Sequence, residues 1–396
     1  MYLLRLGARR QIGFRLRREE VRWRLEALCG QRGLPHVPHG DTIRDYLSRL
    51  TPEHLQGIPV GMVRGLLETR RLEKFRLLDK YYLVAVDMSG HLYLGDRPSE
   101  FTEGCLTQQT EDGRTIYYRP VCEAKLVTRT GLALSVGSEF VENAPRAKQT
   151  EEQYKQDCEL RAGERLFPRL KQALGNFPVC VLLDSLWCNE TGFSLCEAND
   201  WRFLIVLKEG ALPSVMEEFE ALRTQCPENH LTLLNTDARQ DYTWVNAIPY
   251  GPRSLDVLEC LETAPDATQT RFVWVTDIPV TRNLCQALAQ EGGRQRWRIE
   301  NEGFRTQKHG GFEMEHAYAL RPIPAKNFYL LLQATHILSQ MLECYCHGKR
   351  AVKQNFGSLR NLAHALLEAF RRDALPEAEA FHRFLDEAFQ IRLDTS

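Results

Sequence analysis

Apolar positions along the chain change spacing twice, which predicts a helical start, a strand-rich middle and a helical end. Residues 12–80 show helical spacing, interrupted at 33–40 by two prolines and two glycines that no continuous helix tolerates. Asp41 and Thr42 then stand beside an amphipathic run, as helix N-caps do. Residues 81–87, 116–127 and 132–141 are rich in β-branched and aromatic side chains. These three segments predict strands, with a long loop over 88–115.

Helices and strands alternate in the next segment. Leucines near helical spacing predict a helix over 150–174, and an apolar run then ends at Asp184. A short helix near 190–198 and a strand from Trp201 to Leu207 follow. The order strand-strand-strand-helix-strand-helix-strand is the one expected of a ribonuclease H-like core. We therefore predict an α/β protein with a ribonuclease H-like mixed sheet flanked by helices.

The remaining segments suggest how the chain is divided. Residues 212–276 contain a helix near 215–224 and strand-like runs at 230–234, 242–248 and 271–276, which predict a β-rich insertion. From Asn327 onward the pattern is helical, with two further amphipathic helices within 358–392. We predict a helical basic N-terminal domain (1–80), a catalytic core in two parts (81–211 and 277–350), the insertion (212–276) and a helical C-terminal region (351–396).

Composition narrows the class of protein. Of the 396 residues, 43% are hydrophobic and 26% charged, as in ordinary globular proteins. No apolar stretch approaches the roughly 20 residues that span a bilayer, and the N-terminus lacks the pattern of a secretory signal. The cysteines are scattered, which favours reduced thiols in a cytoplasmic protein. Cys344, Cys346 and His347 resemble half a zinc site, but no second cluster accompanies them.

Charge is distributed unevenly although the net charge is −1. Residues 1–80 hold 17 Lys and Arg against 9 Asp and Glu, and seven arginines crowd the span 9–24. A basic arm of this kind is a common nucleic-acid footprint, because arginine matches phosphate oxygens. A solvated helix face, with Glu19, Glu20 and Glu26 interspersed, remains an equal alternative.

Three acids stand where a metal site would need them. Asp87 and Asp184 each follow an apolar run, at the expected carboxyl ends of strands where ligands bind in such sheets. Glu300 lies one helical turn after Arg296, whereas Glu302 points roughly 200° around the same helix. Taken singly, each acid has an ordinary explanation: a turn residue, a polar strand end, or an ion pair with Arg296. Together they have the order and element types of a two-metal site.

The chemistry expected of such a site is phosphoryl transfer. Two divalent cations can activate the attacking oxygen and stabilise the leaving oxygen of a phosphodiester. Mg²⁺, or Mn²⁺ in its place, prefers hard carboxylate oxygens, so Asp87, Asp184 and Glu300 suffice as ligands. Arg296, Lys208 and Lys308 are candidates for holding phosphates, although each could equally be an ordinary surface charge.

The most distinctive segment of the chain is 296–304 (RWRIENEGF). It is accompanied by 84–87 (VAVD), 155–159 (KQDCE), 181–187 (VLLDSLW), 203–210 (FLIVLKEG), 273–277 (VWVTD), 307–312 (QKHGGF) and 315–316 (EH). Through these segments, over about residues 81–345, the chain resembles the DDE transposases of bacterial insertion sequences, in the branch that carries a β-strand insertion before the helix of the catalytic glutamate.

This resemblance implies that Asp87, Asp184 and Glu300 are a catalytic triad that binds two Mg²⁺ ions. It also implies double-stranded DNA as partner, both the terminal inverted repeats of an element and the target, with a homodimer in the synaptic complex. The chain departs from the family pattern at Gly293, where tyrosine is expected, and at Gln307, where lysine is expected. Two alternatives stay open: a ribonuclease H-like nuclease without strand transfer, and a non-catalytic DNA-binding protein descended from a transposase.

Overall fold

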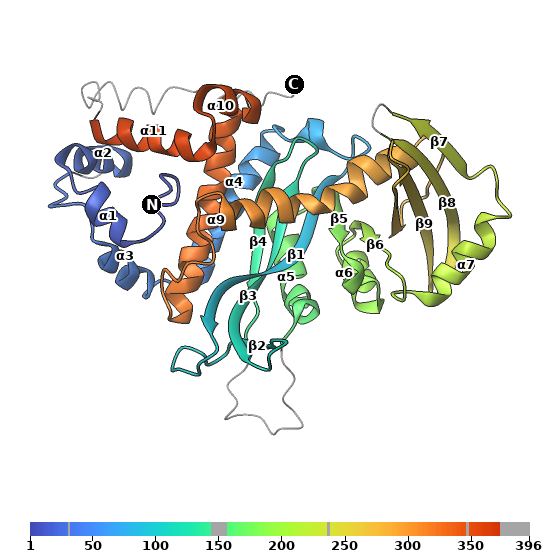
Figure 1. Cartoon of the computed structure of the whole chain (residues 1–396), viewed down its shortest axis with the longest axis horizontal. Helices are drawn as coiled ribbons and strands as arrows, with labels where there is room; N and C mark the ends of the chain where they lie inside the picture. Colours follow the sequence, from blue (N-terminus) through green and yellow to red (C-terminus); the bar gives the residue numbers. More distant parts are fainter. Residues whose placement is uncertain (31, 144–156, 236–237, 346–347, 373–396) are drawn as a thin grey trace.

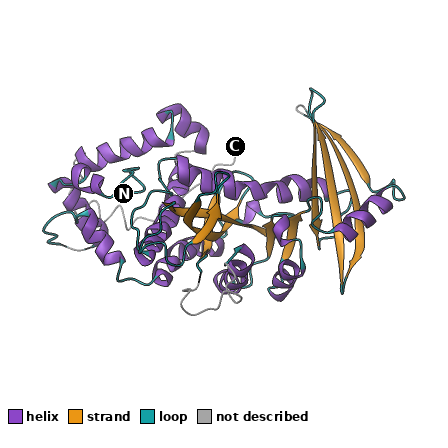
Figure 2. Cartoon of the chain, turned by 60° about the horizontal axis from the view of Figure 1, so that its bottom comes forward, coloured by secondary structure: helices purple, strands orange, loops and turns teal. Residues whose placement is uncertain are grey.

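A ten-stranded mixed sheet forms the centre of the molecule and helices cover both of its faces (Figures 1 and 2). The computed structural model describes residues 1–30, 32–143, 157–235, 238–345 and 348–372. The predicted α/β class, with a mixed sheet flanked by helices, is confirmed. The strands are β1 (Tyr82–Gly95), β2 (Leu106–Gln109), β3 (Thr115–Val127), β4 (Ala133–Phe140), β5 (Val179–Leu183), β6 (Arg202–Val206), β7 (His230–Leu234), β8 (Arg239–Tyr250), β9 (Arg253–Thr263) and β10 (Gln269–Thr276).

Most helices of the described chain lie before β1, between β4 and β7, or after β10. They are α1 (Arg10–Arg15), α2 (Glu19–Cys29), α3 (Gly40–Leu47), α4 (Pro52–Glu68), α5 (Glu159–Leu174), α6 (Glu190–Ala198), α7 (Pro213–Arg223), α8 (Thr306–His309), α9 (Pro322–Tyr345), α10 (Gly348–Phe356) and α11 (Leu359–Arg372). The predicted helix over 150–174 begins at Glu159, and its expected first residues lie outside the described part of the chain.

In the sheet, β1 lies between β3 and β5, so the strand that contains Asp87 is next to the strand that leads to Asp184. The order is β2-β3-β1-β5-β6-β10-β9-β8-β7, with β4 paired to β3. β1 pairs with β5 in parallel, and β5 pairs with β6 in parallel, while the other pairs are antiparallel. Parallel neighbours need a crossover connection, and α5 and α6 occupy the segments between these strands.

Alternation along β1 divides the core into two layers. Val84 and Val86 face one side and pack with residues of α5, whereas Leu83 and Ala85 face the other side and pack with α9. Side chains of a strand alternate between its two faces, so every second residue belongs to the same layer.

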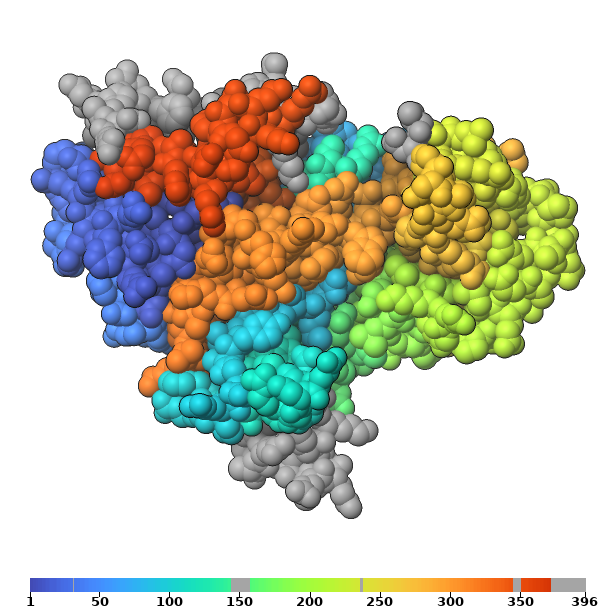
Figure 3. All heavy atoms as spheres, in the orientation of Figure 1, coloured from blue at the N-terminus to red at the C-terminus, as the bar shows by residue number. Residues whose placement is uncertain are grey.

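In Figure 3 the segment around residues 280–330 runs across the visible surface, from the insertion strands toward the N-terminal helices.

The strands predicted for the insertion extend the central sheet. β10 pairs with β6, with Val275 opposite Ile205, and β9, β8 and β7 follow in order. Figure 1 shows these strands at the right-hand end of the molecule with α7 beside them. Because the pairing is continuous, backbone hydrogen bonds tie the insertion to the strand that leads to Lys208.

Two expectations about the strands are wrong. The first strand does not end at Asp87 but continues to Gly95, because Met88 and the residues after it keep pairing with β3. The predicted loop over 88–115 is therefore strand up to Gly95 and again in β2. β9 was not expected, although Leu255–Cys260 is a buried and mostly apolar run. Its acids, Asp256 and Glu259, obscured the strand pattern.

The helices at the two ends of the described chain meet away from the sheet. Leu6, Ile12, Leu16, Val21 and Val37 form a small cluster with Leu367 of α11. By contrast, α4 packs against β4 and α9 and belongs to the main core. No helix in the described residues is long and apolar enough to cross a membrane. Of the half zinc site, Cys346 and His347 lie outside the described residues.

Candidate active site

Strand register brings Asp87 and Asp184 side by side. Ala85 of β1 is paired with Leu182 of β5, and each acid lies two residues farther along its own strand direction. Asp184 keeps an extended backbone (φ −85°, ψ 178°), so the alternation continues through it. Parallel strands lie about 4.8 Å apart, and side chains two residues apart share a face. Both acids therefore lie on the face of Ala85 and Leu182.

The segment that carries Glu300 covers this same face. It is not a regular α-helix: Gly293–Arg296 is a 3-10 turn and Ile299–Arg305 is a π-helix. Ile299 and Phe304 are fully buried in the core layer that contains Ala85 and Leu182, and Glu300 is partly exposed. π-helical turns occur frequently at functional sites. Glu302 pairs with Arg298 at 2.6 Å.

Arg296 links this segment to Asp87. Its Nη1 donates to Asp87 Oδ2 at 3.2 Å, and the residue is only 9% exposed. Burial raises the pKa of Asp87, Arg296 opposes that rise, and the charges of Asp184 and Glu300 add to it. The three predicted acids are thus close enough for their charges to interact. Arg296 Nε is buried and has no hydrogen-bond partner in the described structure, so the bond to Asp87 leaves this guanidinium incompletely satisfied.

The ligand chemistry suits Mg²⁺ or Mn²⁺, but the site is not pre-assembled. Carboxylate oxygens are the ligands that hard divalent cations prefer. Within the described residues, however, no group of three or more His, Cys, Asp or Glu side chains is arranged to hold an ion. A guanidinium stands beside Asp87 instead. Binding of two cations would therefore require Arg296 to release Asp87 and the carboxylates to draw together.

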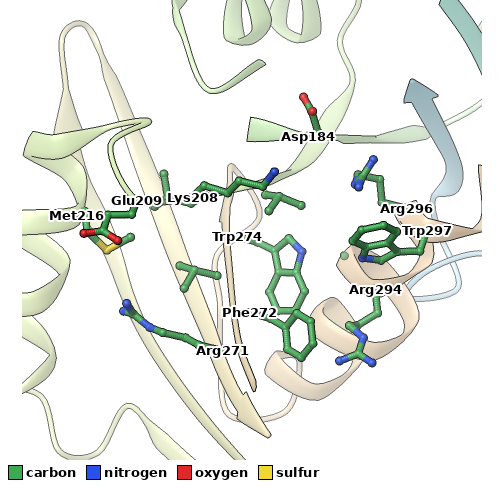
Figure 4. A pocket seen from close by; sticks show the side chains of 14 residues that line it. Asp184, Lys208, Glu209, Met216, Arg271, Phe272, Trp274, Arg294, Arg296 and Trp297 are labelled. Carbon is green, nitrogen blue, oxygen red and sulfur yellow. The ribbon is translucent and has the colours of Figure 1, made fainter. Parts of the chain in front are cut away.

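A cavity of about 530 Å³ opens beside Asp184. Lys208 and Arg296 reach it from opposite sides, and Asp184 also lines it (Figure 4). Phe272 and Trp274 stack in its wall with ring centroids 6.0 Å apart, and the Arg294 guanidinium lies 4.0 Å from the Phe272 ring. Cationic and aromatic side chains together suit a nucleic-acid strand, which offers phosphates and stacking bases.

Lys308 does not join this group. Its Nζ pairs with Glu315 at 3.1 Å, and Lys308 is not among the residues that line the cavity. Gln307, which stands where the resembled family has lysine, is fully buried and hydrogen-bonded to Gln333 and His336. It faces the protein interior, so a charged side chain there would lose its hydration.

Gly293, at the position where the family has tyrosine, also has a local explanation. A Cβ atom at this position would lie 2.3 Å from Nε1 of Trp274. No side chain fits unless the indole moves, so Trp274 fills the space next to the 3-10 turn. The two departures from the family pattern are therefore accommodated by packing specific to this chain.

Sequence reasoning missed a fourth acid. Glu159, in the first turn of α5, is 8% exposed, and its Oε1 accepts a hydrogen bond of 3.0 Å from Nε1 of Trp187. Burial raises its pKa to about 7; the Trp187 bond opposes this rise, and the charges of Asp184 and Asp87 add to it. A signal was present in the sequence, because Glu159 continues the apolar stripe of α5 that includes Ala162, Leu166 and Leu170.

Comparison with known proteins adds no relative to this picture. No protein-family model matches the chain, and no curated protein matches it significantly.

Proposed function

We propose that this chain is a DNA transposase of an insertion sequence, which cuts and joins phosphodiester bonds by two-metal catalysis. The observation that carries the proposal is that Asp87 and Asp184 lie on neighbouring parallel strands, on the sheet face that the segment of Glu300 covers, with Arg296 of that segment bonded to Asp87. Acids that repel one another are costly to keep together, and such clusters are typical of functional sites. The proposal includes a cytoplasmic location and a homodimer in the DNA complex.

The arrangement of the strands supports a ribonuclease H-like core. Five neighbouring strands have the order β4-β3-β1-β5-β6, in which β1, β3 and β4 form antiparallel pairs and β1, β5 and β6 form parallel pairs. This is the pattern expected of a core whose first strand and fourth strand carry metal-binding acids. β7–β10 and α7 stand where the insertion of the resembled transposases would stand.

Each residue of the site has a proposed role. Asp87, Asp184 and Glu300 would bind two Mg²⁺ ions, which would activate the attacking oxygen and stabilise the leaving one. Arg296 would exchange Asp87 for a phosphate oxygen through the Nη1 atom that donates to Asp87 in this structure. Lys208, exposed at the cavity, would hold a neighbouring phosphate. Lys308 would contribute only after release from Glu315.

Double-stranded DNA is the proposed partner, both as element ends and as target. The basic helices at residues 1–80 and the cationic cavity beside Asp184 offer surfaces for its backbone. Because phosphate contacts dominate affinity, binding would weaken steeply with added salt.

The test is cleavage and joining of element-end DNA by purified protein in Mg²⁺. A labelled duplex that carries the short inverted ends flanking the gene would be the donor, and a plasmid the target. Asp87→Ala, Asp184→Ala and Glu300→Ala should each reduce cleavage by on the order of 10²–10³-fold while DNA affinity changes little. Glu302→Ala is the matched control, because this acid of the same segment pairs with Arg298 and not with Arg296 or Asp87. Normal cutting by any of the three site variants would refute the proposal.

One observation favours a second candidate, a non-catalytic DNA-binding protein. Arg296 occupies the position beside Asp87, and the described residues contain no ready metal cluster. DNA binding without cleavage in either Mg²⁺ or Mn²⁺ would support that reading. Cleavage without joined products in the same assay would instead identify a nuclease that lacks strand transfer.

A further inference from the structure

Glu159 and Trp187 form a buried bridge from α5 to the turn that carries Asp184. Trp187 belongs to the 3-10 turn Ser185–Trp187, and its backbone N–H donates to the carbonyl of Asp184 at 3.2 Å. Asp184 itself caps this turn, because its carboxylate accepts from the N–H of Leu186. Any displacement of Trp187 would therefore be transmitted directly to Asp184.

The indole of Trp187 is held in place from several sides. It is fully buried and stacks on Phe167 of α5, with ring centroids 5.7 Å apart. A Cβ atom at Gly163 would lie 1.9 Å from the ring, and one at Gly192 would lie 2.1 Å from the Trp187 carbonyl oxygen. Both positions must therefore lack a side chain for Trp187 to lie here. With the ring fixed, its N–H is directed at Glu159.

Trp201 provides an internal comparison. It is also buried and also packs on Phe167, with centroids 5.8 Å apart. Its Nε1 has no hydrogen-bond partner in the described structure. Packing alone is thus enough to hold a tryptophan against α5, and the carboxylate at Glu159 is not needed for that purpose. Burying a carboxyl group costs free energy, so we expect the bond between Glu159 and Trp187 to have a role other than packing.

We infer that Glu159 is a positioning residue of the metal site, which fixes the Asp184 turn through the indole N–H of Trp187. The inference rests on the proposed function, since it assumes that Asp184 binds a divalent cation. Partners that orient a metal ligand from behind change metal affinity when removed, typically by 10–100-fold. Glu159 would act on affinity in this way, without touching substrate.

The test measures Mn²⁺ binding to the full-length protein by electron paramagnetic resonance, so that it does not depend on DNA cleavage. Glu159→Ala and Trp187→Phe should each weaken Mn²⁺ binding by about tenfold. The double variant should be no weaker than either single one, because both remove the same bond. Glu159→Gln should restore most of the affinity, since its amide oxygen still accepts from the indole. Two matched controls, the exposed Glu164→Ala on the same helix and Trp201→Phe, should bind as the wild type does.

Asp184→Ala sets the scale and separates the two possible failures. If Asp184→Ala binds Mn²⁺ as tightly as the wild type, or if the wild type binds none, the proposed metal site fails and the inference falls with it. If Asp184→Ala weakens binding but folded Glu159→Ala does not, only the inference is overturned. Loss of affinity in Glu159→Gln equal to that in Glu159→Ala would also overturn it, because the hydrogen bond would then not be what matters.

Discussion

Two acidic residues that face each other across β1 and β3 have opposite surroundings. Glu123 is fully buried, and its carboxylate accepts from Lys125, Ser135, Ser138 and Tyr329. Asp87 is its partner in the strand register, yet only Arg296 and a backbone N–H bond to its carboxylate in the described structure.

The difference separates a charge whose hydrogen bonds the fold satisfies from one that has few partners. Around Glu123 every oxygen is bonded, so the cluster ties β3 to β4 and α9. Around Asp87 the charges of Asp184 and Glu300 raise its pKa further, after burial, and a single guanidinium opposes them. Excess negative charge of this kind is not explained by stability, but it suits a site that receives cations.

Removal of Glu123 should have the largest effect on stability. Glu123→Ala leaves the ammonium of Lys125 buried without its counter-charge, since Lys125 is fully buried and otherwise bonded to Gln333. Breaking one side of a buried pair costs about 3–5 kcal/mol. Urea denaturation followed by circular dichroism would measure it. A loss in the free energy of unfolding below about 1 kcal/mol would show that Glu123 is not the structural charge described here.

The pH dependence of stability should show that Glu159, like Asp87, is a buried carboxyl group whose pKa is raised. The folded pKa of Glu159 is about 7 against an ordinary 4.5, so stability conferred by its protonated form is lost as pH rises from about 4.5 to about 7. Between pH 5 and pH 8 the wild type should therefore lose roughly 2–3 kcal/mol relative to Glu159→Gln. Urea midpoints of both proteins without divalent cations, with Glu164→Gln as control, would test this. Parallel pH profiles for wild type and Glu159→Gln would contradict it.

A smaller effect is expected from Asp87→Asn without added metal. The substitution removes a carboxylate whose pKa is raised by burial, but it also weakens the bond to Arg296. Removing the buried carboxylate stabilises the folded protein and weakening its bond to Arg296 destabilises it, so the free energy of unfolding should rise by no more than about 1 kcal/mol. Stabilisation by added Mg²⁺, which thermal unfolding would show for the wild type, should disappear in the variant. A loss of several kcal/mol would place Asp87 among the structural charges with Glu123.

Part of this contrast was visible in the sequence. The apolar run that ends at Asp184 predicted a buried strand with an acid at its end, and β5 has that form. That Asp87 and Asp184 lie side by side could not be derived in the same way, because their closeness depends on which strands pair and in what register. The sequence predicts a strand end at Asp87, because an acid follows six apolar or aromatic residues there.

Other features of the site escape local reasoning for physical reasons. Regular helical geometry was assumed for 296–304, and the 3-10 and π segments change which side chains face the sheet. The bond between Arg296 and Asp87 joins residues 209 positions apart, so no local pattern predicts it. Glu159 was the missed opportunity, since an acid on the apolar stripe of α5 already indicated an unusual environment.

A crystal structure of the protein with an element-end duplex and Mn²⁺ would test the central claim most directly. Anomalous scattering would locate the ions without assumptions about activity. The account predicts two manganese peaks, roughly 3.5–4 Å apart, ligated by Asp87, Asp184 and Glu300, with Arg296 moved from Asp87 to a phosphate. Clear DNA density with no manganese between these carboxylates, and with Arg296 still bound to Asp87, would contradict it.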